Sequence, residues 1–212
     1  MDLEKKQIRK SIMQLRDKIS KEEKQCFDEA IFNHIINSEY YKNATMIFIF
    51  VSYLSEVDTK PVIMKALADN KIVCVPKIRS KEAGMELYVI KGLMDLAEGF
   101  HGILEPKSYC KKVNMNDGSE GTAPNGDGDG EGENYYDGNK LDLIIMPGVA
   151  FSMEGGRIGY GGGFYDRFIF NLKRDVKKIA IAYELQIIEN IPMDRHDAKI
   201  DGIITEKQTT IF

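Results

Sequence analysis

The amino-acid sequence predicts an α/β fold in which helices cover the faces of a parallel or mostly parallel sheet. Short apolar runs rich in β-branched residues, which are typical of buried strands, alternate along the chain with segments of helical periodicity. Between residues 155 and 163, six glycines fall within nine positions and join one of these strands to a helical segment. Glycine costs conformational entropy, so a folded chain does not collect it without a reason. This loop is therefore the first candidate for a binding site.

Two helices are predicted at the start of the chain. Over residues 3–19, apolar residues recur at three- and four-residue spacing, which is the pattern of an amphipathic helix: Ile8, Ile12, Leu15 and Ile19. Ser20, followed three residues later by Glu23, is a capping-box pattern. It predicts a second helix over about 21–37.

Six segments have the composition of strands. The first, TMIFIFVSY, is a continuous apolar run and predicts a buried central strand. The ranges of the six are 45–53, 71–77, 84–90, 141–148, 177–184 and 201–206. After the first strand, Asp58 and Thr59 offer an N-cap, and Pro61 lies in the first turn of a helix that is expected to reach about Asn70.

Residues 111–140 interrupt this alternation. They contain seven acidic residues and three lysines, a net charge of −4, and few aliphatic side chains. Such a stretch cannot bury enough apolar surface to offset its ordering entropy. We therefore expect a low-complexity, flexible insertion within one domain that spans residues 1–212. NGDGDG at 125–130 begins like an EF-hand loop, but its twelfth position is Tyr136 instead of Glu, so a linker is the better interpretation.

Composition and charge argue against several functional classes. The net charge of −4 and the pI near 5.5 argue against a nucleic acid as the main partner, because binding to its phosphates requires a basic face. The longest apolar run has eight residues and the N-terminus is charged, so neither a membrane span nor a secretory signal is expected. The expected compartment is the cytoplasm, and a mitochondrial location is less favoured. The cysteines and histidines lack the spacing of a disulfide framework or a metal site.

The glycine segment EGGRIGYGGGFYDRF, residues 154–168, follows a predicted strand and precedes a predicted helix. Amides without neighbouring side chains can form a concave anion site, and a helix N-terminus adds partial positive charge. Arg157 adds a guanidinium that can bind phosphate as a fork. No lysine follows the glycines as in a Walker A motif, and Phe164 occupies the last glycine position of a dinucleotide fingerprint. Phosphate binding is the favoured interpretation, and a tightly packed structural turn is the alternative.

Other charged residues are weaker candidates when they are taken one by one. Lys5 and Arg9 lie one turn apart on the first helix, a pattern that more often marks a solvated surface. Glu56 follows the carboxyl end of the first strand, where ligands gather in open α/β sheets, although a loop carboxylate in water is the simpler interpretation. Asp166 and Asp201 could together hold Mg²⁺. Asp201 could equally be a turn residue at the edge of a strand.

Taken together, these motifs resemble the 5-formyltetrahydrofolate cyclo-ligase family, whose members are also called methenyltetrahydrofolate synthetases. The resemblance is carried by the pair Lys5 and Arg9 and, in chain order, by FVSYLSEVDT, VPKI, GMELYVI, GILEP, MPGVAFSMEGGRIGYGGGFYDRF and KIDGIIT. It covers nearly the whole chain apart from residues 111–140. Phe164 stands where the family commonly has tyrosine, which keeps the ring and loses the hydroxyl. The resemblance implies a three-layer α/β sandwich around a mostly parallel sheet, similar to sugar-phosphate isomerases and CoA transferases.

The resemblance also implies an enzyme that uses ATP and Mg²⁺ to convert the small molecule 5-formyltetrahydrofolate to 5,10-methenyltetrahydrofolate, with release of ADP and phosphate. A monomer is expected, although the sequence does not give the oligomeric state. On this sequence, the nucleotide would be bound by Lys5, Arg9, Arg157, Gly159, Tyr160, Gly161, Gly162, Gly163, Phe164 and Tyr165. The pterin and formyl group would be bordered by Glu56, Met85, Phe100, His101 and Tyr165. Among all of these, the catalytic residues would be Arg157, Glu56 and Tyr165. The metal would be held by Asp166 and Asp201.

The residues leave two other functions of the same architecture open. One is a phosphosugar-type isomerase, which would bind a sugar phosphate at the glycine loop without consuming ATP. The other is a ligand-sensing module without catalysis. The joint presence of Lys5, Arg9, Arg157, Asp166 and Asp201 argues against both, because neither function needs a site for a triphosphate and a metal. A nucleophile motif such as G-x-S-x-G is absent from the sequence, as expected for phosphoryl transfer, which depends on positioning and charge neutralisation.

Overall fold

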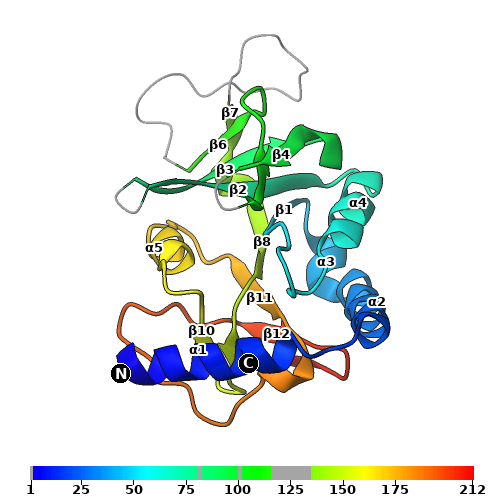
Figure 1. Cartoon of the computed structure of the whole chain (residues 1–212). Helices are drawn as coiled ribbons and strands as arrows, with labels where there is room; N and C mark the ends of the chain where they lie inside the picture. Colours follow the sequence, from blue (N-terminus) through cyan, green and yellow to red (C-terminus); the bar gives the residue numbers. More distant parts are fainter. Residues whose placement is uncertain (1, 81–82, 100–101, 116–134) are drawn as a thin grey trace.

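The computed structural model describes residues 2–80, 83–99, 102–115 and 135–212. Within this part of the chain, nine strands form one mixed sheet at the centre of the molecule (Figure 1). From one edge to the other, the strands are β13 (Thr209–Ile211), β12 (Gly202–Ile204), β11 (Lys177–Ile181), β8 (Leu141–Met146), β1 (Met46–Ile49), β2 (Ile72–Ser80), β3 (Gly84–Ile90), β6 (Lys112–Asn114) and β7 (Tyr135–Asp137).

Most neighbouring strands of this sheet are parallel. β12, β11, β8, β1 and β2 form a continuous parallel block. β13 and β3 flank this block and run antiparallel to their neighbours in it, and β6 pairs antiparallel with β3 but parallel with β7. All four residues of β1 are buried, as expected for a central strand that is covered on both faces. The predicted mostly parallel α/β sheet is therefore confirmed.

Helices cover both faces of the sheet and give the three layers that were predicted (Figure 1). α5 (Phe164–Phe170) packs on the face that carries Phe48 of β1, whereas Ile47 and Ile49 of the same strand point to the opposite face. The opposite face is covered by α2 (Lys21–Asn37), α3 (Glu39–Asn43) and α4 (Lys60–Ala68). The alternation of side chains along β1 thus divides the main core into two layers, one on each side of the sheet.

The N-terminal helix lies apart from these layers and packs on a small hairpin. α1 (Asp2–Arg16) places Ile12 in a third apolar cluster, against residues of a two-stranded unit. That unit consists of β9 (Ala150–Phe151) and β10 (Arg157–Ile158), which pair antiparallel. The first two helices therefore form where their periodicity and capping box predict, although α1 ends three residues before the expected limit at residue 19.

The first strand is shorter than the apolar run from which it was predicted. β1 ends at Ile49, and the following residues form a loop that is buried at Phe50, Val51, Val57 and Thr59. Side chains of that loop take up backbone donors that a longer strand would direct to its neighbours: Ser52 N donates to Thr59 Oγ1 at 2.9 Å, and Tyr53 N donates to Glu56 Oε2 at 2.8 Å. Because β1 ends early, the loop that carries Glu56 begins at the carboxyl edge of the sheet.

The expected insertion is narrower than the composition of residues 111–140 suggests. Its two ends form β6 and β7, which pair in parallel at the edge of the sheet. The expectation of a flexible segment concerns residues 116–134, which lie outside the described residues. Several short elements escaped the sequence analysis: the antiparallel pair β4 (Leu96–Glu98) and β5 (Leu104–Pro106), and the 3₁₀ turns Leu93–Asp95, Gly138–Lys140 and Glu184–Gln186. The single-domain organisation of residues 1–212 stays a prediction.

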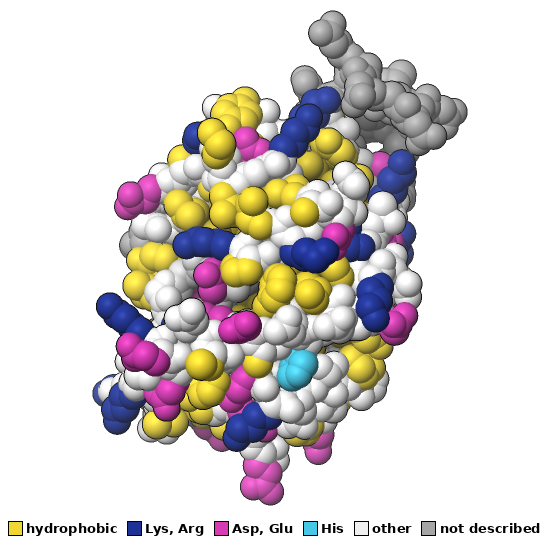
Figure 2. Space-filling model, turned by 90° about the vertical axis from the view of Figure 1, so that its right-hand side faces the viewer, with side chains coloured by type: hydrophobic (Ala, Val, Ile, Leu, Met, Phe, Trp, Pro, Cys, Tyr) yellow, Lys and Arg dark blue, Asp and Glu magenta, His cyan; other side chains and the backbone are white. Residues whose placement is uncertain are grey.

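The face in Figure 2 carries positive and negative side chains interspersed with hydrophobic ones. Neither sign of charge forms a continuous area on this face. Over the described ranges, every helix is too short or too polar to cross a membrane.

The capping box of α2 allows a test of the local folding signal. Ser20 Oγ accepts a hydrogen bond from Glu23 N at 3.2 Å, and Glu23 Oε2 accepts one from Ser20 N at 3.0 Å. We expect Ser20→Ala to lower the free energy of unfolding by about 1 kcal/mol, measured by urea denaturation. Ser11→Ala, at an exposed interior position of α1, is the control and should change it by less than about 0.5 kcal/mol. Equal effects of the two substitutions would contradict the assignment of the cap.

Candidate functional site

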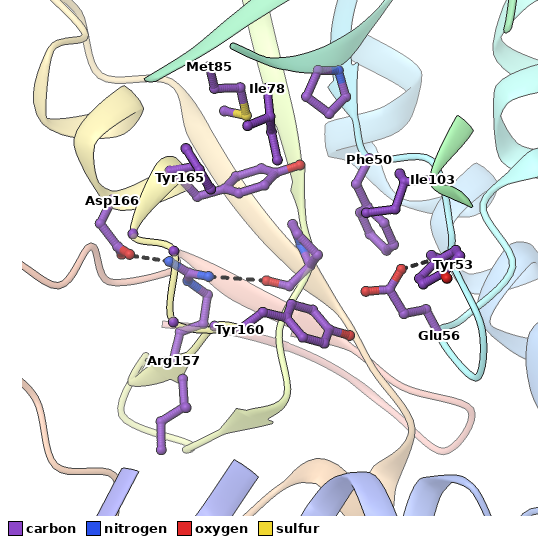
Figure 3. Close-up of a pocket in the computed structure, with 18 of the residues that line it drawn as sticks. Phe50, Tyr53, Glu56, Ile78, Met85, Ile103, Arg157, Tyr160, Tyr165 and Asp166 are labelled. Carbon is purple, nitrogen blue, oxygen red and sulfur yellow. Dashed lines mark hydrogen bonds and ion pairs between the residues drawn. The ribbon is translucent and has the colours of Figure 1, made fainter. Parts of the chain in front are cut away.

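A pocket of about 370 Å³ opens at the carboxyl ends of two neighbouring parallel strands, β1 and β8 (Figure 3). Phe50 and Val51, which follow β1, and Pro147, which follows β8, belong to its lining. From β1 the chain continues to β2 on one side, and from β8 it continues to β11 on the other side. The pocket thus lies at the point where the strand order reverses, which is where α/β sheets bind their ligands, and its size suits a small molecule.

The glycine loop forms one wall of this pocket. Residues 159–163 all belong to the lining. A β-carbon on Gly159 would lie 2.8 Å from Nη1 of Arg157, and Gly161 has a φ angle of 99°, which a side chain disfavours. At these two positions glycine is required by the protein's own packing and backbone conformation. A tightly packed structural turn, the alternative to phosphate binding, therefore explains the glycines at these two positions.

The surroundings of the loop differ from the expected strand–loop–helix unit in two ways. The hairpin β9–β10 is inserted between β8 and the loop, and α5 has only seven residues. So short a helix adds little dipole, which leaves the loop amides as the donors for an anion. In the described structure, the amides of residues 160–163 donate to no other group of the protein. They remain available to a ligand.

Arg157 lies beneath the loop and is 5% exposed. Its Nη2 donates to Asp166 Oδ1 at 2.6 Å and its Nη1 donates to the carbonyl of Pro147 at 3.2 Å, as Figure 3 shows. The buried Nε has no partner among the described residues. Arg157 was predicted as a phosphate fork, but the structure shows that it also joins the end of β8 to the start of α5.

Lys5 and Arg9 belong to the pocket, although such a pair more often marks a solvated surface. Lys5 is 7% exposed, and its Nζ donates to Asp194 Oδ2 at 2.9 Å and to Asp197 Oδ2. Burial alone would lower the pKa of Lys5, but the hydrogen bonds to the two carboxylates raise it above its ordinary value. Arg9 Nε donates to the carbonyl of Gly159 at 2.7 Å. Both cations of α1 are therefore fixed beside the glycine loop.

The two predicted metal ligands are not brought together. Asp166 lines the pocket, and its Oδ1 also accepts a hydrogen bond from Ala198 N at 3.1 Å. Asp201 precedes β12, where its Oδ2 accepts from Lys178 N at 2.8 Å and pairs with Lys178 Nζ at 2.9 Å. Because β12 is parallel to β1 and β8, this is the amino edge of the sheet, opposite to the edge that carries the pocket. The second carboxylate in this part of the pocket is Asp197.

Sequence analysis missed Asp194 and Asp197. The signal for them was weak, because they lie in an irregular segment with three aspartates within eight residues, and only Asp201 begins a strand-like run. Burial would raise the pKa of Asp197, but hydrogen bonds from Asp194 N and from Lys5 lower it below its ordinary value. Within the described residues, no group of three or more His, Cys, Asp or Glu side chains is arranged to hold a metal by itself.

Tyr165 points its hydroxyl into the pocket (Figure 3). The ring is positioned by the central strand, because it stacks on Phe48 with ring centroids 5.3 Å apart and planes 5° from parallel. Its hydroxyl oxygen is buried and has no hydrogen-bond partner among the described residues. A buried hydroxyl without a partner is unfavourable, which indicates that a ligand atom completes its hydrogen bonding.

Glu56 faces Tyr165 across the pocket (Figure 3). Burial raises the pKa of Glu56, and this effect is only partly opposed by hydrogen bonds from Tyr160 and from the amide of Tyr53 and by the charges of Arg16 and Lys24. A carboxylate held in this way can accept a hydrogen bond from a ligand. The simpler interpretation, a loop carboxylate in water, does not hold.

The upper wall of the pocket in Figure 3 is apolar. Met85 and Ile78 come from β3 and β2, and Ile103 from the segment before β5. Such a wall suits the faces of a flat heterocycle. Phe164 lines the pocket beside the glycine loop, and the guanidinium of Arg167 lies 5.1 Å from the centre of its ring. The predicted residues Phe100 and His101 lie outside the described residues.

Comparison with known proteins gives one consistent result. The model of the 5-formyltetrahydrofolate cyclo-ligase family matches residues 2–206. A probable 5-formyltetrahydrofolate cyclo-ligase of Caenorhabditis elegans is 32% identical over 98% of this chain and 95% of its own length, and the Mus musculus 5-formyltetrahydrofolate cyclo-ligase is 29% identical over 95% and 93%. The NMR structure of Aquifex aeolicus 5,10-methenyltetrahydrofolate synthetase aligns with a TM-score of 0.77 at 27% identity, over 98% of this chain and 92% of that one.

The close approach of Arg157 to Gly159 generates a prediction. A methyl group at position 159 would press on Nη1 of Arg157, which donates to Pro147, and shift the guanidinium from its partners, so Gly159→Ala should lower the free energy of unfolding by about 1–3 kcal/mol in urea denaturation. Gly92→Ala is the matched control, because the nearest atom to its added β-carbon lies 3.9 Å away and its φ of −176° is extended. Gly159→Ala with the stability of the control would show that Arg157 does not lie beneath the loop.

Proposed function

The chain belongs to the 5-formyltetrahydrofolate cyclo-ligase family, and we propose that it converts 5-formyltetrahydrofolate to 5,10-methenyltetrahydrofolate with hydrolysis of ATP to ADP and phosphate. The observation that carries this proposal is the construction of the pocket. One wall offers unbonded amides with Lys5 and Arg9 beside them, and the facing side offers an apolar surface with the half-buried carboxylate of Glu56. The first wall suits a polyphosphate and the second a pterin.

The proposed reaction has two steps. A formamide oxygen is a poor leaving group, so the formyl oxygen first attacks the γ-phosphorus of ATP, ADP departs, and an iminium phosphate forms on the folate. The nitrogen at position 10 then attacks the formyl carbon, phosphate leaves, and loss of the proton of that nitrogen gives the methenyl product. The first step is a phosphoryl transfer, for which positioning and charge neutralisation matter more than a protein nucleophile.

The residues of the pocket divide between these tasks. Lys5 and Arg9 neutralise the phosphates together with the loop amides, and Arg157 holds the loop and Asp166 in place beneath them. Tyr165 donates its unpartnered hydroxyl to the substrate, and Glu56 accepts a hydrogen bond from the opposite side. These two groups fix the pterin and formyl group relative to the γ-phosphate.

Mg²⁺ fits this site only when the nucleotide is bound with it. Asp166 and Asp197 line the pocket, and Mg²⁺ is commonly held by one or two carboxylates plus phosphate oxygens. We assign these two residues as the ligands in place of the pair Asp166 and Asp201. When bound, the ion would neutralise charge on the transferred phosphoryl group. The monomeric state and the cytoplasmic location of the protein stay predictions.

The main test of this function is spectroscopic. Methenyltetrahydrofolate absorbs in the near ultraviolet, away from its precursor, so protein mixed with 5-formyltetrahydrofolate, Mg²⁺ and ATP should produce that band. Omission of ATP should abolish it. A band without ATP, or none with it, would contradict the proposal, and the second result would favour the sensing module. Turnover of a sugar phosphate without ATP would favour the isomerase.

The choice of metal ligands is tested by a pair of substitutions. Asp197→Asn should lower kcat/KM by about 10- to 100-fold and raise the Mg²⁺ concentration needed for half-maximal activity. Asp201→Asn should leave both within about threefold, because this carboxylate pairs with Lys178 at the other edge of the sheet. The reverse order of effects would restore Asp201 as the ligand. Thermal unfolding of both variants controls for loss of structure.

A further inference from the structure

A buried arginine on the last turn of α1 lies behind the wall of the pocket. Arg16 is 3% exposed. Among the described residues, Tyr160 and Glu56 line the pocket and Arg16 does not. A buried guanidinium is costly unless its donors are paired, so its partners indicate what it holds.

These partners come from two separate loops of the pocket. Nη1 of Arg16 donates to Tyr160 Oη, in the glycine loop, at 2.9 Å. Its Nε donates to Ser55 Oγ, in the loop that carries Glu56, at 3.1 Å. Ser55 Oγ donates in turn to Asp17 Oδ1 at 2.5 Å, so two consecutive residues at the end of α1 hold this loop at Ser55. The guanidinium carbon also lies 5.9 Å from the centre of the Tyr160 ring, within the range of a cation–π contact.

The Tyr160 hydroxyl connects the two loops directly. It accepts from Arg16, and on its other side it faces the carboxylate of Glu56, whose pKa it lowers as a hydrogen-bond donor. A hydroxyl that accepts from a cation is polarised and donates more strongly to a carboxylate. The direction in which Glu56 faces the ligand therefore depends on a residue that does not itself touch the ligand.

We propose that Arg16 is a positioning residue, which fixes Tyr160 of the nucleotide wall against Glu56 of the substrate wall and so sets the distance between the two reactants. The inference rests on the proposed function, because the distance between nucleotide and folate matters only if the two react with each other in the pocket. The competing interpretation is that Arg16 only anchors α1 to the core, in which case it affects stability alone.

A kinetic double-mutant cycle separates these two interpretations. Arg16→Met and Tyr160→Phe should each lower kcat/KM for 5-formyltetrahydrofolate by about tenfold or more, the scale of one charge-assisted hydrogen bond. The double variant should lose at most a further two- to threefold, because both changes break the same connection. Losses that multiply would overturn the proposal. Arg16→Lys, which keeps the charge, should recover part of the activity lost in Arg16→Met.

Arg174→Met is the control for removal of an arginine away from the pocket, at an exposed position instead of a buried one. This arginine donates to the carbonyls of Asn139 and Leu141 and pairs with Asp142, at the amino end of β8 and far from the pocket mouth. Its removal should lower the thermal unfolding temperature with kcat/KM within about twofold of the wild type. An equal loss of kcat/KM in this control and in Arg16→Met would show that reduced stability explains both.

The pH profile gives a second readout that a purely structural role would not move. Glu56 is faced by Tyr160 from the glycine loop, Arg16 from α1, Lys24 from α2 and Tyr165 from α5. Loss of the Arg16 charge favours the protonated carboxyl, so the acid limb of the kcat/KM profile should move to higher pH in Arg16→Met. An unmoved acid limb would count against the proposal.

Hydrogen exchange tests the connection without reference to activity. Arg16→Met should raise exchange of the hydrogen-bonded amides of the 50–59 loop, such as Ser52, Tyr53 and Glu56, by about tenfold or more, whereas Arg174→Met should not. An active wild-type enzyme with unchanged exchange in Arg16→Met would overturn this proposal alone. Raised exchange in this loop, with a wild type that forms no methenyl product, would overturn the proposed function and leave Arg16 as a structural connection only.

Discussion

The pocket depends on the buried guanidinium of Arg157. Its bonds to Pro147 and Asp166 join the end of the central strand β8 to the start of α5, and Gly159 passes directly over it. Asp166 extends the connection by accepting from Ala198 N, which fixes the segment that carries the partners of Lys5. A buried cation must be paired to be tolerated. The pairing of this guanidinium fixes four segments between residues 147 and 198 relative to one another.

The charges around the glycine loop nearly balance. Four cations and three carboxylates lie in this region, so their formal sum is +1: Lys5, Arg9, Arg157, Arg167, Asp166, Asp194 and Asp197. A triphosphate brings more negative charge than this set offsets. The ligand must therefore either displace cations from their carboxylates or arrive with a cation of its own. This is the physical reason to expect nucleotide and Mg²⁺ to bind together, with the carboxylates passing from lysine and arginine to the metal.

The sequence predicted the elements whose signals are local. It did not predict positions and burial that depend on contacts between distant segments. The capping box at Ser20 and the apolar runs of the parallel strands are local, and the structure has them. The glycine motif, read with its resemblance to a family, located the pocket. Asp201 was predicted as a metal ligand at the start of a strand-like run, but the direction of β12 places it at the opposite edge of the sheet, and Asp197 was missed. The burial of Lys5 was equally invisible, because its partners lie about 190 residues away.

The pocket carries an energetic cost that a bound ligand can remove. Among the described residues, two buried side-chain atoms lack hydrogen-bond partners, Nε of Arg157 and the hydroxyl oxygen of Tyr165, and both residues line the pocket. Each such group costs about 1–3 kcal/mol of desolvation. A ligand that bonds to them recovers this cost and stabilises the fold by mass action. Rigid stacking of Tyr165 on Phe48 prevents its hydroxyl from finding another partner inside the protein. The packing that leaves the Tyr165 hydroxyl without a partner therefore also holds it in place for the ligand. The stability that the protein loses in this way is regained as affinity when the ligand binds.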